Sequence, residues 1–204
     1  MAKLYFIYSA MNAGKSTILL QSAYNYRERG MQVMLWTSGH YRDGETDTAE
    51  ITSRIGLNAE ARLYRPDIDL FEAIAARKNQ GPLDAVFVDE AQFLEAEQVW
   101  QLARVADRLH VPVMCYGLRT DFQGKLFPGS AELLAISDQL REVRTICHCG
   151  SKATMTARVD AEGRAITEGR QVEVVKPHDR DVPRNRLTLV LNGGDGPQRH
   201  KIVG

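Results

Sequence analysis

The chain has 204 residues, enough for one well-packed domain or for one domain with a small appendage. Lys plus Arg balance Asp plus Glu at 26 each, so the net charge gives no indication of a nucleic acid or a membrane surface as a partner. The longest apolar runs have the length of strands, which excludes a transmembrane helix. A strand that begins at Leu4 leaves no room for a signal peptide, and with only three cysteines we expect a reducing, cytoplasmic location.

The first two thirds of the sequence alternate between strand-like and helix-like segments. In chain order, the patterns predict a strand over 4–8, a helix over 15–29, a strand over 33–37, a helix over 68–78, a strand over 85–89, a helix over 95–109 and a strand over 111–116. The stretch 38–58 is polar and has no clear period, so it is interpreted as a mobile surface loop. Apolar strands that alternate with helices form sheets covered on both faces, and we therefore expect an α/β fold with a mostly parallel sheet.

The character of the sequence changes near residue 145. Cys147-His148-Cys149-Gly150 forms a knuckle, and short alternating segments follow over 153–159 and 171–175. From residue 176 onward the chain is rich in proline and then in glycine, which is typical of a loosely ordered tail. The sequence thus predicts three parts, namely an α/β core over 1–144, a small β-rich unit over 145–175 and a poorly ordered tail over 176–204.

The strongest motif lies between the first predicted strand and the first predicted helix. It matches the pattern G-x-x-x-x-G-K-[ST] of phosphate-binding loops, except that Ser9 replaces the first glycine. Gly14 lets the backbone curl around a phosphate, Lys15 can reach the β- and γ-phosphates, and the Ser16 hydroxyl can ligate magnesium. We therefore expect a P-loop nucleotide-binding core whose loop binds ATP through Ser9, Ala10, Met11, Asn12, Ala13, Gly14, Lys15, Ser16 and Thr17.

Two acids end the third predicted strand. An apolar strand that ends in acids is typical of a Walker-B element, in which Asp89 would hold magnesium opposite Ser16, with Phe87 and Val88 beside it in the nucleotide site. Glu90 follows by one residue and points elsewhere, so it can accept a proton from water in an ATPase or from an acceptor hydroxyl in a kinase. The tetrad from Asp89 also resembles a helicase box, but such helicases need two lobes and a basic channel, and this sequence predicts neither.

Six segments, in this order, together resemble the type II (zinc-containing) thymidine kinases, particularly those of enteric-like bacteria. They are YSAMNAGKST (8–17), SRIG (53–56), VDEAQFL (88–94), CYGLRTDF (115–122), FPGS (127–130) and TICHCG (145–150). The resemblance runs from residue 2 to about residue 172. It implies transfer of the ATP γ-phosphate to thymidine or deoxyuridine in the salvage of DNA precursors, a P-loop core, a β-rich zinc-knuckle (lasso) domain and usually a homotetramer.

The resemblance also implies roles for single residues. Glu90 is expected to be the general base for the 5′-hydroxyl of the nucleoside. An apolar slot favours a flat base, and the expected walls of a thymine pocket are Met11, Phe93, Leu118, Phe122 and Phe127. Arg42 or Arg54 is a possible phosphate contact, and Arg119 is a better-placed basic residue. Two interpretations from other classes stay open: a P-loop ATPase or GTPase in which Glu90 activates water, and a nucleotide-binding module without catalysis.

The sequence departs from the family pattern at the zinc site. The family adds a second Cys-x-x-His or Cys-x-x-Cys pair about thirty-five residues after the first, close to a tyrosine and a Gly-Gly turn. Here Cys147 and Cys149 supply two ligands, no later cysteine follows, and His178 is only a weak candidate. Because tetrahedral structural zinc needs four ligands, we expect zinc affinity and the segment that folds over the base to be weakened.

Overall fold

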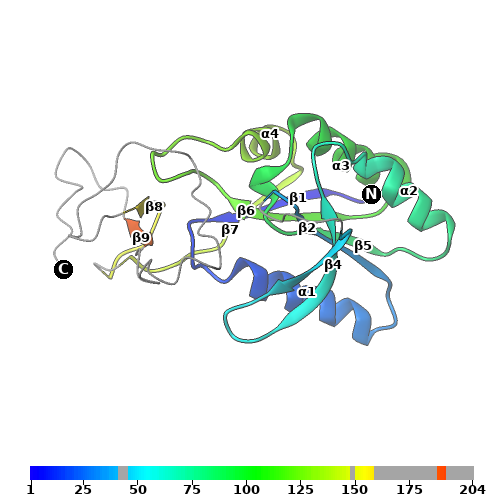
Figure 1. Cartoon of the computed structure of the whole chain (residues 1–204), viewed down its shortest axis with the longest axis horizontal. Helices are drawn as coiled ribbons and strands as arrows, with labels where there is room; N and C mark the ends of the chain where they lie inside the picture. The colour runs from blue at the N-terminus through cyan, green and yellow to red at the C-terminus, as the bar shows by residue number, and fades with distance from the viewer. Residues whose placement is uncertain (41–45, 148–149, 159–187, 192–204) are drawn as a thin grey trace.

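The computed structural model describes residues 1–40, 46–147, 150–158 and 188–191 (Figure 1). Its main element is a seven-stranded sheet with the strand order β3-β4-β2-β5-β6-β1-β7. Every neighbouring pair in this sheet is parallel except β3 with β4, which confirms the predicted mostly parallel sheet. The strands are β1 (Leu4–Ser9), β2 (Val33–Ser38), β3 (Thr48–Thr52), β4 (Asn58–Tyr64), β5 (Ala85–Val88), β6 (Val113–Leu118) and β7 (Gln139–Glu142).

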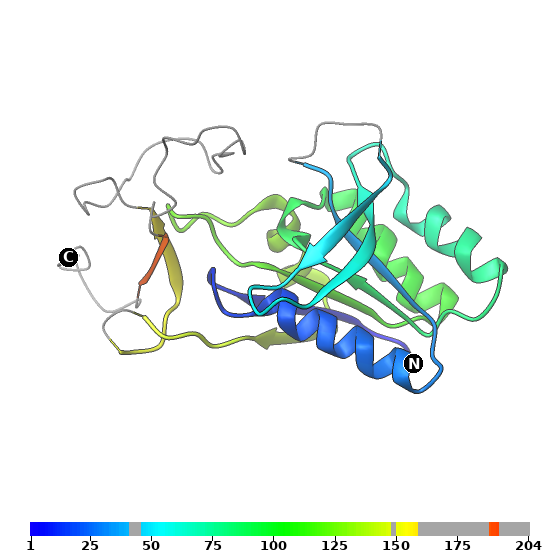
Figure 2. The same cartoon turned by 60° about the horizontal axis from the view of Figure 1, so that its bottom comes forward.

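Helices cover both faces of this sheet, as the sequence predicted. They are α1 (Lys15–Glu28), α2 (Leu70–Asn79), α3 (Ala96–Leu109) and α4 (Pro128–Ile136), with a short 3-10 helix, η1 (Ala91–Phe93). Figure 1 shows α1 on one side of the sheet and α2, α3 and α4 on the other, and Figure 2 shows α1 lying along its own face. In the parts of the chain that the structure describes, no helix has both the length and the apolarity that a bilayer crossing requires.

A separate hydrophobic core lies on each face of the sheet. Phe6 and Val88 belong to the core beneath α2 and α3, whereas Ile7 and Phe87 belong to the core beneath α1. Successive side chains of a strand point to opposite faces, so one short strand can contribute to both cores. Phe87 and Val88 are both fully buried, and they fix the end of β5 from which Asp89 leaves the sheet.

The helix ends follow signals that the sequence carries. Gly30 lies just beyond the end of α1 with φ 76°, and its N–H and that of Met31 donate to the carbonyls of Arg27 and Tyr26 at 2.9 and 3.1 Å. Asp69 caps α2 by accepting a hydrogen bond from the Glu72 N–H at 3.0 Å. The three predicted helices, α1, α2 and α3, begin and end within two residues of their expected bounds.

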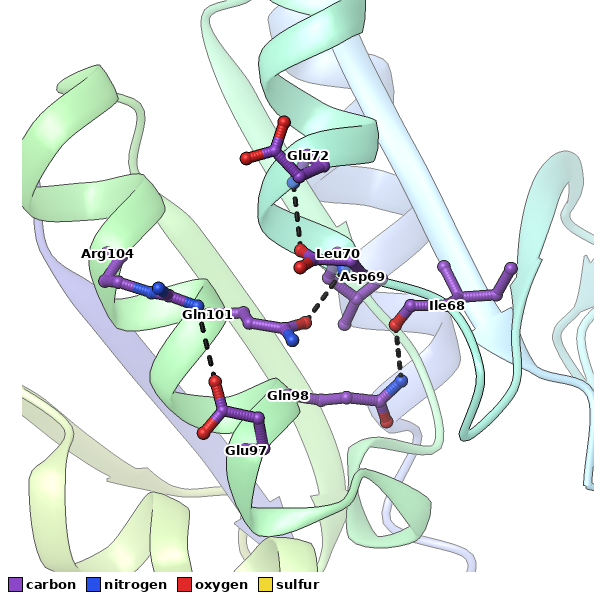
Figure 3. A network of polar contacts seen from close by, with 8 residues as sticks. All are labelled: Ile68, Asp69, Leu70, Glu72, Glu97, Gln98, Gln101 and Arg104. Atoms are coloured by element: carbon purple, nitrogen blue, oxygen red, sulfur yellow. Dashed lines mark hydrogen bonds and ion pairs between the residues drawn. The ribbon is translucent and has the colours of Figure 1, made fainter.

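Two buried glutamines of α3 hold the start of α2 against it (Figure 3). Gln101 Oε1 accepts from the Leu70 N–H at 2.8 Å, and Gln98 Nε2 donates to the carbonyls of Arg65 and Ile68 at 2.8 and 3.1 Å. The same Gln98 completes a capping box with Glu95 at the N-terminus of α3. These amides satisfy backbone groups that would otherwise be buried without partners.

The structure corrects the expectation of a surface loop over residues 38–58. Thr48–Thr52 forms β3, and Asn58–Tyr64 pairs with it as β4, with Ile51 and Ala61 buried against α1. Alternating apolar positions in these strands were obscured by the many Thr, Asp and Glu residues around them. Residues 41–45 lie outside the described residues. The sequence also gave no expectation for α4 or β7, although a proline at the first turn of α4 is a recognised helix-start signal.

The small unit beyond residue 145 is described only in part. β8 (Met155–Arg158) falls within the predicted segment 153–159, and it pairs in antiparallel fashion with β9 (Thr188–Leu191). β9 lies inside the range 176–204, for which the sequence predicted a loosely ordered tail, so these four residues differ from that expectation. The predicted segment 171–175 and the rest of the tail lie outside the described residues.

Candidate active site

Three strand ends that are far apart in the sequence meet at one edge of the sheet. β6 lies between β5 and β1, and its register pairs Leu118 with Ser9 and Cys115 with Val88. Because these strands are parallel, their carboxyl ends and the loops that follow them lie side by side. Open α/β sheets bind ligands at this edge. The expected phosphate loop, the acid pair and Leu118 therefore lie at the same edge of the sheet.

The phosphate loop has the backbone that its motif demands. Gly14 is the N-terminal cap of α1 with φ 79°, and Asn12 is also left-handed with φ 64°. The Lys15 ammonium turns back over the loop, where it donates to Ser9 Oγ at 3.0 Å and to the Ala10 carbonyl at 3.1 Å. Ser9 is buried and its hydroxyl also donates to the Ala10 carbonyl at 2.6 Å. The serine that replaces the first glycine thus helps to hold Lys15 in the loop.

A hydrogen bond joins the phosphate loop to the acid pair. Ser16 Oγ donates to Asp89 Oδ2 at 3.0 Å, across the end of β6. Burial raises the pKa of Asp89 from 3.8 to about 6, with a further contribution from the charge of Glu90, while the Ser16 bond opposes the shift. Burial also lowers the pKa of Lys15, against the opposing charges of Glu90 and Asp89. A hydroxyl and a desolvated carboxylate are hard oxygen ligands, so this pair fits a magnesium ion.

Glu90 follows Asp89 in a conformation that is rare for a residue with a side chain. Its backbone is left-handed, with φ 54° and ψ 32°, and its carbonyl accepts a hydrogen bond from the Tyr64 hydroxyl at 2.7 Å. Its carboxylate accepts a second bond from the Gln92 side-chain amide. Glu90 is partly exposed, and its charge acts on Lys15 of the phosphate loop.

The residues expected to surround a thymine base are distributed around this edge. Phe93 and Phe127 form an edge-to-face pair with ring centroids 5.8 Å apart, and His40 stacks on Phe93 at 5.1 Å. Leu118, at the end of β6, is half-buried and donates its N–H to Gln92. The structure therefore brings Phe93, Phe127 and Leu118 to one region beside Glu90.

The other two expected wall residues contact the small unit. The Met11 N–H donates to Thr156 Oγ1 at 3.0 Å, so a strand of the small unit reaches the phosphate loop. Phe122 lies under the Arg158 guanidinium, 4.2 Å from the ring centroid. Arg119 donates to the Thr154 carbonyl at 3.0 Å and thereby joins the end of β6 to the same unit.

Only the first of the expected zinc ligands lies in the described part of the chain. Cys147 is buried, its N–H donates to the Ser151 carbonyl at 2.8 Å, and its carbonyl accepts from the Gly150 N–H at 2.9 Å. Cys149 and His178 lie outside the described residues. Within the described ranges, no group of three or more His, Cys, Asp or Glu side chains is arranged to hold a metal ion.

Sequence reasoning missed several residues that shape the site. Tyr64 ends β4, a strand that was not predicted, and its hydroxyl has no signature in the sequence. Gln92 stands inside the motif that contains Asp89 and Glu90, but the spacing alone gave it no role. Thr156 lies far from the phosphate loop in the chain, and only the fold brings its hydroxyl to Met11.

A phosphate-loop motif after β1, an acid just beyond β5 hydrogen-bonded to it and a second acid beside it are the features of an α/β protein of the P-loop class. A family model described as thymidine kinase matches residues 2–175. The chain therefore belongs to the thymidine kinase family, and the resemblance seen in the sequence is confirmed.

Curated relatives agree with this assignment. The thymidine kinase of Ruegeria pomeroyi is 65% identical over 174 residues, which are 85% of this chain and 87% of that protein. The thymidine kinase of Mesorhizobium japonicum is 63% identical over 176 residues, 86% of each chain. That of Agrobacterium fabrum is 62% identical over 174 residues, 85% of this chain and 89% of the relative.

Proposed function

We propose that this chain transfers the γ-phosphate of ATP to the 5′-hydroxyl of thymidine. The observation that carries the proposal is the hydrogen bond from Ser16 to Asp89, at 3.0 Å, because it couples the phosphate loop to the acid pair of which Glu90 is the second member. The family to which the chain belongs supports the same reaction. Deoxyuridine, which differs from thymidine by one methyl group, is proposed as a second acceptor.

The phosphate loop is proposed to bind the triphosphate through the backbone N–H groups that precede α1. Lys15 would leave Ser9 and Ala10 for the β- and γ-phosphates, and its charge would stabilise the negative charge that spreads over the transferring group. Ser16 and Asp89 would hold magnesium, which when bound neutralises charge on the phosphates. Phe87 and Val88 act from within the two cores by fixing the position of Asp89.

Glu90 is proposed to act on the acceptor. The 5′-oxygen attacks the γ-phosphorus, the bond from that phosphorus to the bridging oxygen of ADP breaks, and the hydroxyl proton passes to the Glu90 carboxylate. The products are dTMP and ADP, and Glu90 then returns its proton to solvent.

The aromatic residues are proposed to bind the base. Phe93 and Phe127 already pack edge to face, and an apolar slot that also includes Leu118 would stack on the flat ring of thymine. Met11 and Phe122 are proposed to close the slot on the side of the small unit. Their contacts with Thr156 and Arg158 support this placement, because these contacts link the slot to β8.

Three further properties are proposals that follow from the family. Cys147 and Cys149 would supply two thiolates to a structural zinc ion, but the sequence offers no second cysteine pair and only His178 as a weak third ligand. We therefore infer weak zinc binding. A homotetramer and a cytoplasmic location are expected from the family, with thymidine and ATP as the partners and no nucleic acid or membrane.

The deciding experiment measures phosphate transfer from labelled ATP to thymidine, with a reaction lacking nucleoside and a Glu90→Gln variant run beside it. Transfer that requires thymidine and falls by about two to four orders of magnitude in the variant supports the proposed kinase. ATP hydrolysis of equal rate with and without thymidine would favour the ATPase. Tight ATP binding without transfer to any nucleoside would favour a binding module.

A further inference from the structure

Gln92 is a buried side chain that contacts the proposed general base. Only 1% of its surface is exposed, and it lies in η1, two residues beyond Glu90. Its side-chain oxygen, Oε1, accepts a hydrogen bond from the Leu118 N–H at 3.0 Å. Because a backbone N–H can only donate, this bond fixes which end of the amide is oxygen. The side-chain nitrogen then faces Glu90 and donates to its Oε2.

Two neighbouring glycines make room for this amide and for the short helix that carries it. A Cβ at Gly117 would lie 2.9 Å from Gln92 Oε1, and one at Gly129 would lie 2.6 Å from the Ala91 carbonyl and 2.7 Å from that of Leu94. Both glycines therefore allow close approach of β6 and α4 to η1. Ser130 Oγ also donates to the Leu118 carbonyl at 2.5 Å, so the residue that fixes Gln92 is itself fixed.

The carboxylate of Glu90 needs such a partner. The last torsion of a glutamate side chain is broad, so the carboxylate group rotates unless a hydrogen bond restrains it. The backbone of Glu90 is already held by the Tyr64 hydroxyl at its carbonyl. The amide of Gln92 adds a restraint at the opposite end of the same residue, and it is desolvated, which strengthens the bond.

We propose that Gln92 is a positioning residue for phosphate transfer, which holds the Glu90 carboxylate in the orientation that accepts the acceptor proton and ties it to Leu118 at the end of β6. The inference rests on the proposed function of Glu90. It adds that one amide holds both the carboxylate of Glu90 and the backbone of Leu118, a proposed wall of the acceptor slot. The distance between the general base and that wall is therefore fixed before substrate binds. Preorganisation of this kind lowers the barrier through geometry and leaves nucleotide binding unchanged.

The test is a double-mutant cycle between Gln92→Met and Glu90→Gln. Methionine has a similar length but neither donates nor accepts as an amide does. In the otherwise unchanged protein, we expect Gln92→Met to lower kcat by about 10- to 100-fold while the KM for ATP stays within about twofold. In the Glu90→Gln background, the same substitution should change kcat by less than about threefold, because the group that it positions is already gone.

Gln101→Met is the matched control. Gln101 is also a buried glutamine whose Oε1 accepts a hydrogen bond from a backbone N–H, that of Leu70, but this bond joins α3 to the start of α2 (Figure 3). Its substitution should lower the melting temperature and leave kcat within about twofold in both backgrounds. If Gln92→Met lowers kcat by the same factor with and without Glu90, the role of Gln92 is structural. This inference is then overturned, while the proposed function of Glu90 still stands. If Glu90→Gln has no effect on kcat, the proposed function of Glu90 and this inference fall together.

A second pair of variants keeps the inference testable should Gln92→Met fail to fold. Gln92→Glu has the same size, but it sets two carboxylates against each other and should lower the melting temperature by several degrees. The double variant Glu90→Gln/Gln92→Glu restores an amide facing a carboxylate, so it should recover most of that loss while phosphate transfer stays at the level of Glu90→Gln. Additive changes in melting temperature would show that the two side chains do not interact, which overturns the inference.

Discussion

Replacing Asp89 by asparagine is expected to stabilise the nucleotide-free protein and to abolish its reaction. Asparagine keeps an oxygen that can accept from Ser16 and removes a charge that the fold has desolvated. Without that charge the site would lose its proposed magnesium ligand, so phosphate transfer should fall by at least about two orders of magnitude. The stability gain should appear only in the absence of metal and nucleotide.

The size of the gain follows from the pKa of Asp89. Its pKa is raised from 3.8 to about 6, so the folded state binds the proton more tightly than the unfolded state does. The contribution of Asp89 to the free energy of unfolding is therefore most favourable below the pKa that it has in the unfolded chain. This contribution is lost as the pH rises from 3.8 through about 6. At 1.36 kcal/mol per pKa unit, the loss reaches about 3 kcal/mol at pH 8 and about half of that at pH 5. Asparagine does not suffer this loss.

The assay is thermal unfolding with EDTA present, at pH 5 and at pH 8. For a chain of this size, about 3 kcal/mol corresponds to a rise in melting temperature of about 6 to 12 °C at pH 8, with a smaller rise at pH 5. Asp107→Asn, at an exposed position of α3, serves as the control and should leave the melting temperature nearly unchanged at both values. A gain that is equal at the two pH values, or an Asp89→Asn protein that melts lower at pH 8, would refute the reasoning.

Three other changes test separate parts of the structure. Gly129→Ala places a methyl group 2.6 Å from the Ala91 carbonyl, so η1 must shift. The free energy of unfolding should fall by about 1 to 3 kcal/mol, and kcat should fall as well. An alanine variant with a normal melting temperature and normal turnover would contradict this packing. Phe93→Leu removes a ring that packs edge to face on Phe127. Steady-state kinetics should show a higher KM for thymidine with little change in the KM for ATP. An equal rise in both KM values would show that Phe93 does not line the thymine slot. Protein purified without added metal should contain well below one zinc ion per chain by elemental analysis, because the sequence supplies only the thiolates of Cys147 and Cys149. One chelator-resistant zinc ion per chain would show that other ligands complete the site.

The backbone of the proposed phosphate site could be predicted from the sequence because its signals are local. The loop from Ser9 to Thr17 needs one strand, one glycine with positive φ and one helix, and all three signals are contiguous in the chain. Asp89 was found for the same reason, since an apolar run that ends in acids predicts the end of a buried strand. The class of fold followed from the alternation of these elements.

The supports of the site were not accessible in this way. Tyr64, Gln92 and Thr156 act through hydrogen bonds to residues that are distant in sequence or that have no fixed spacing from them. The presence of a tyrosine or a glutamine in the sequence does not indicate which residue its side chain will bind through a hydrogen bond. β3 and β4 were missed because polar residues fill their outward positions, which leaves too few apolar residues for a clear period.

The place of β1 within the sheet has a consequence for how the chain acquires its activity. β1 is the first strand to be synthesised, yet its two neighbours, β6 and β7, are Val113–Leu118 and Gln139–Glu142. Its backbone donors and acceptors therefore have no strand partner until more than half of the chain has been made, and pairing then closes a very long loop. During that interval an apolar strand with two open edges is exposed to other chains. The loop that follows β1 can therefore reach Asp89 only when the middle of the chain has folded beside it.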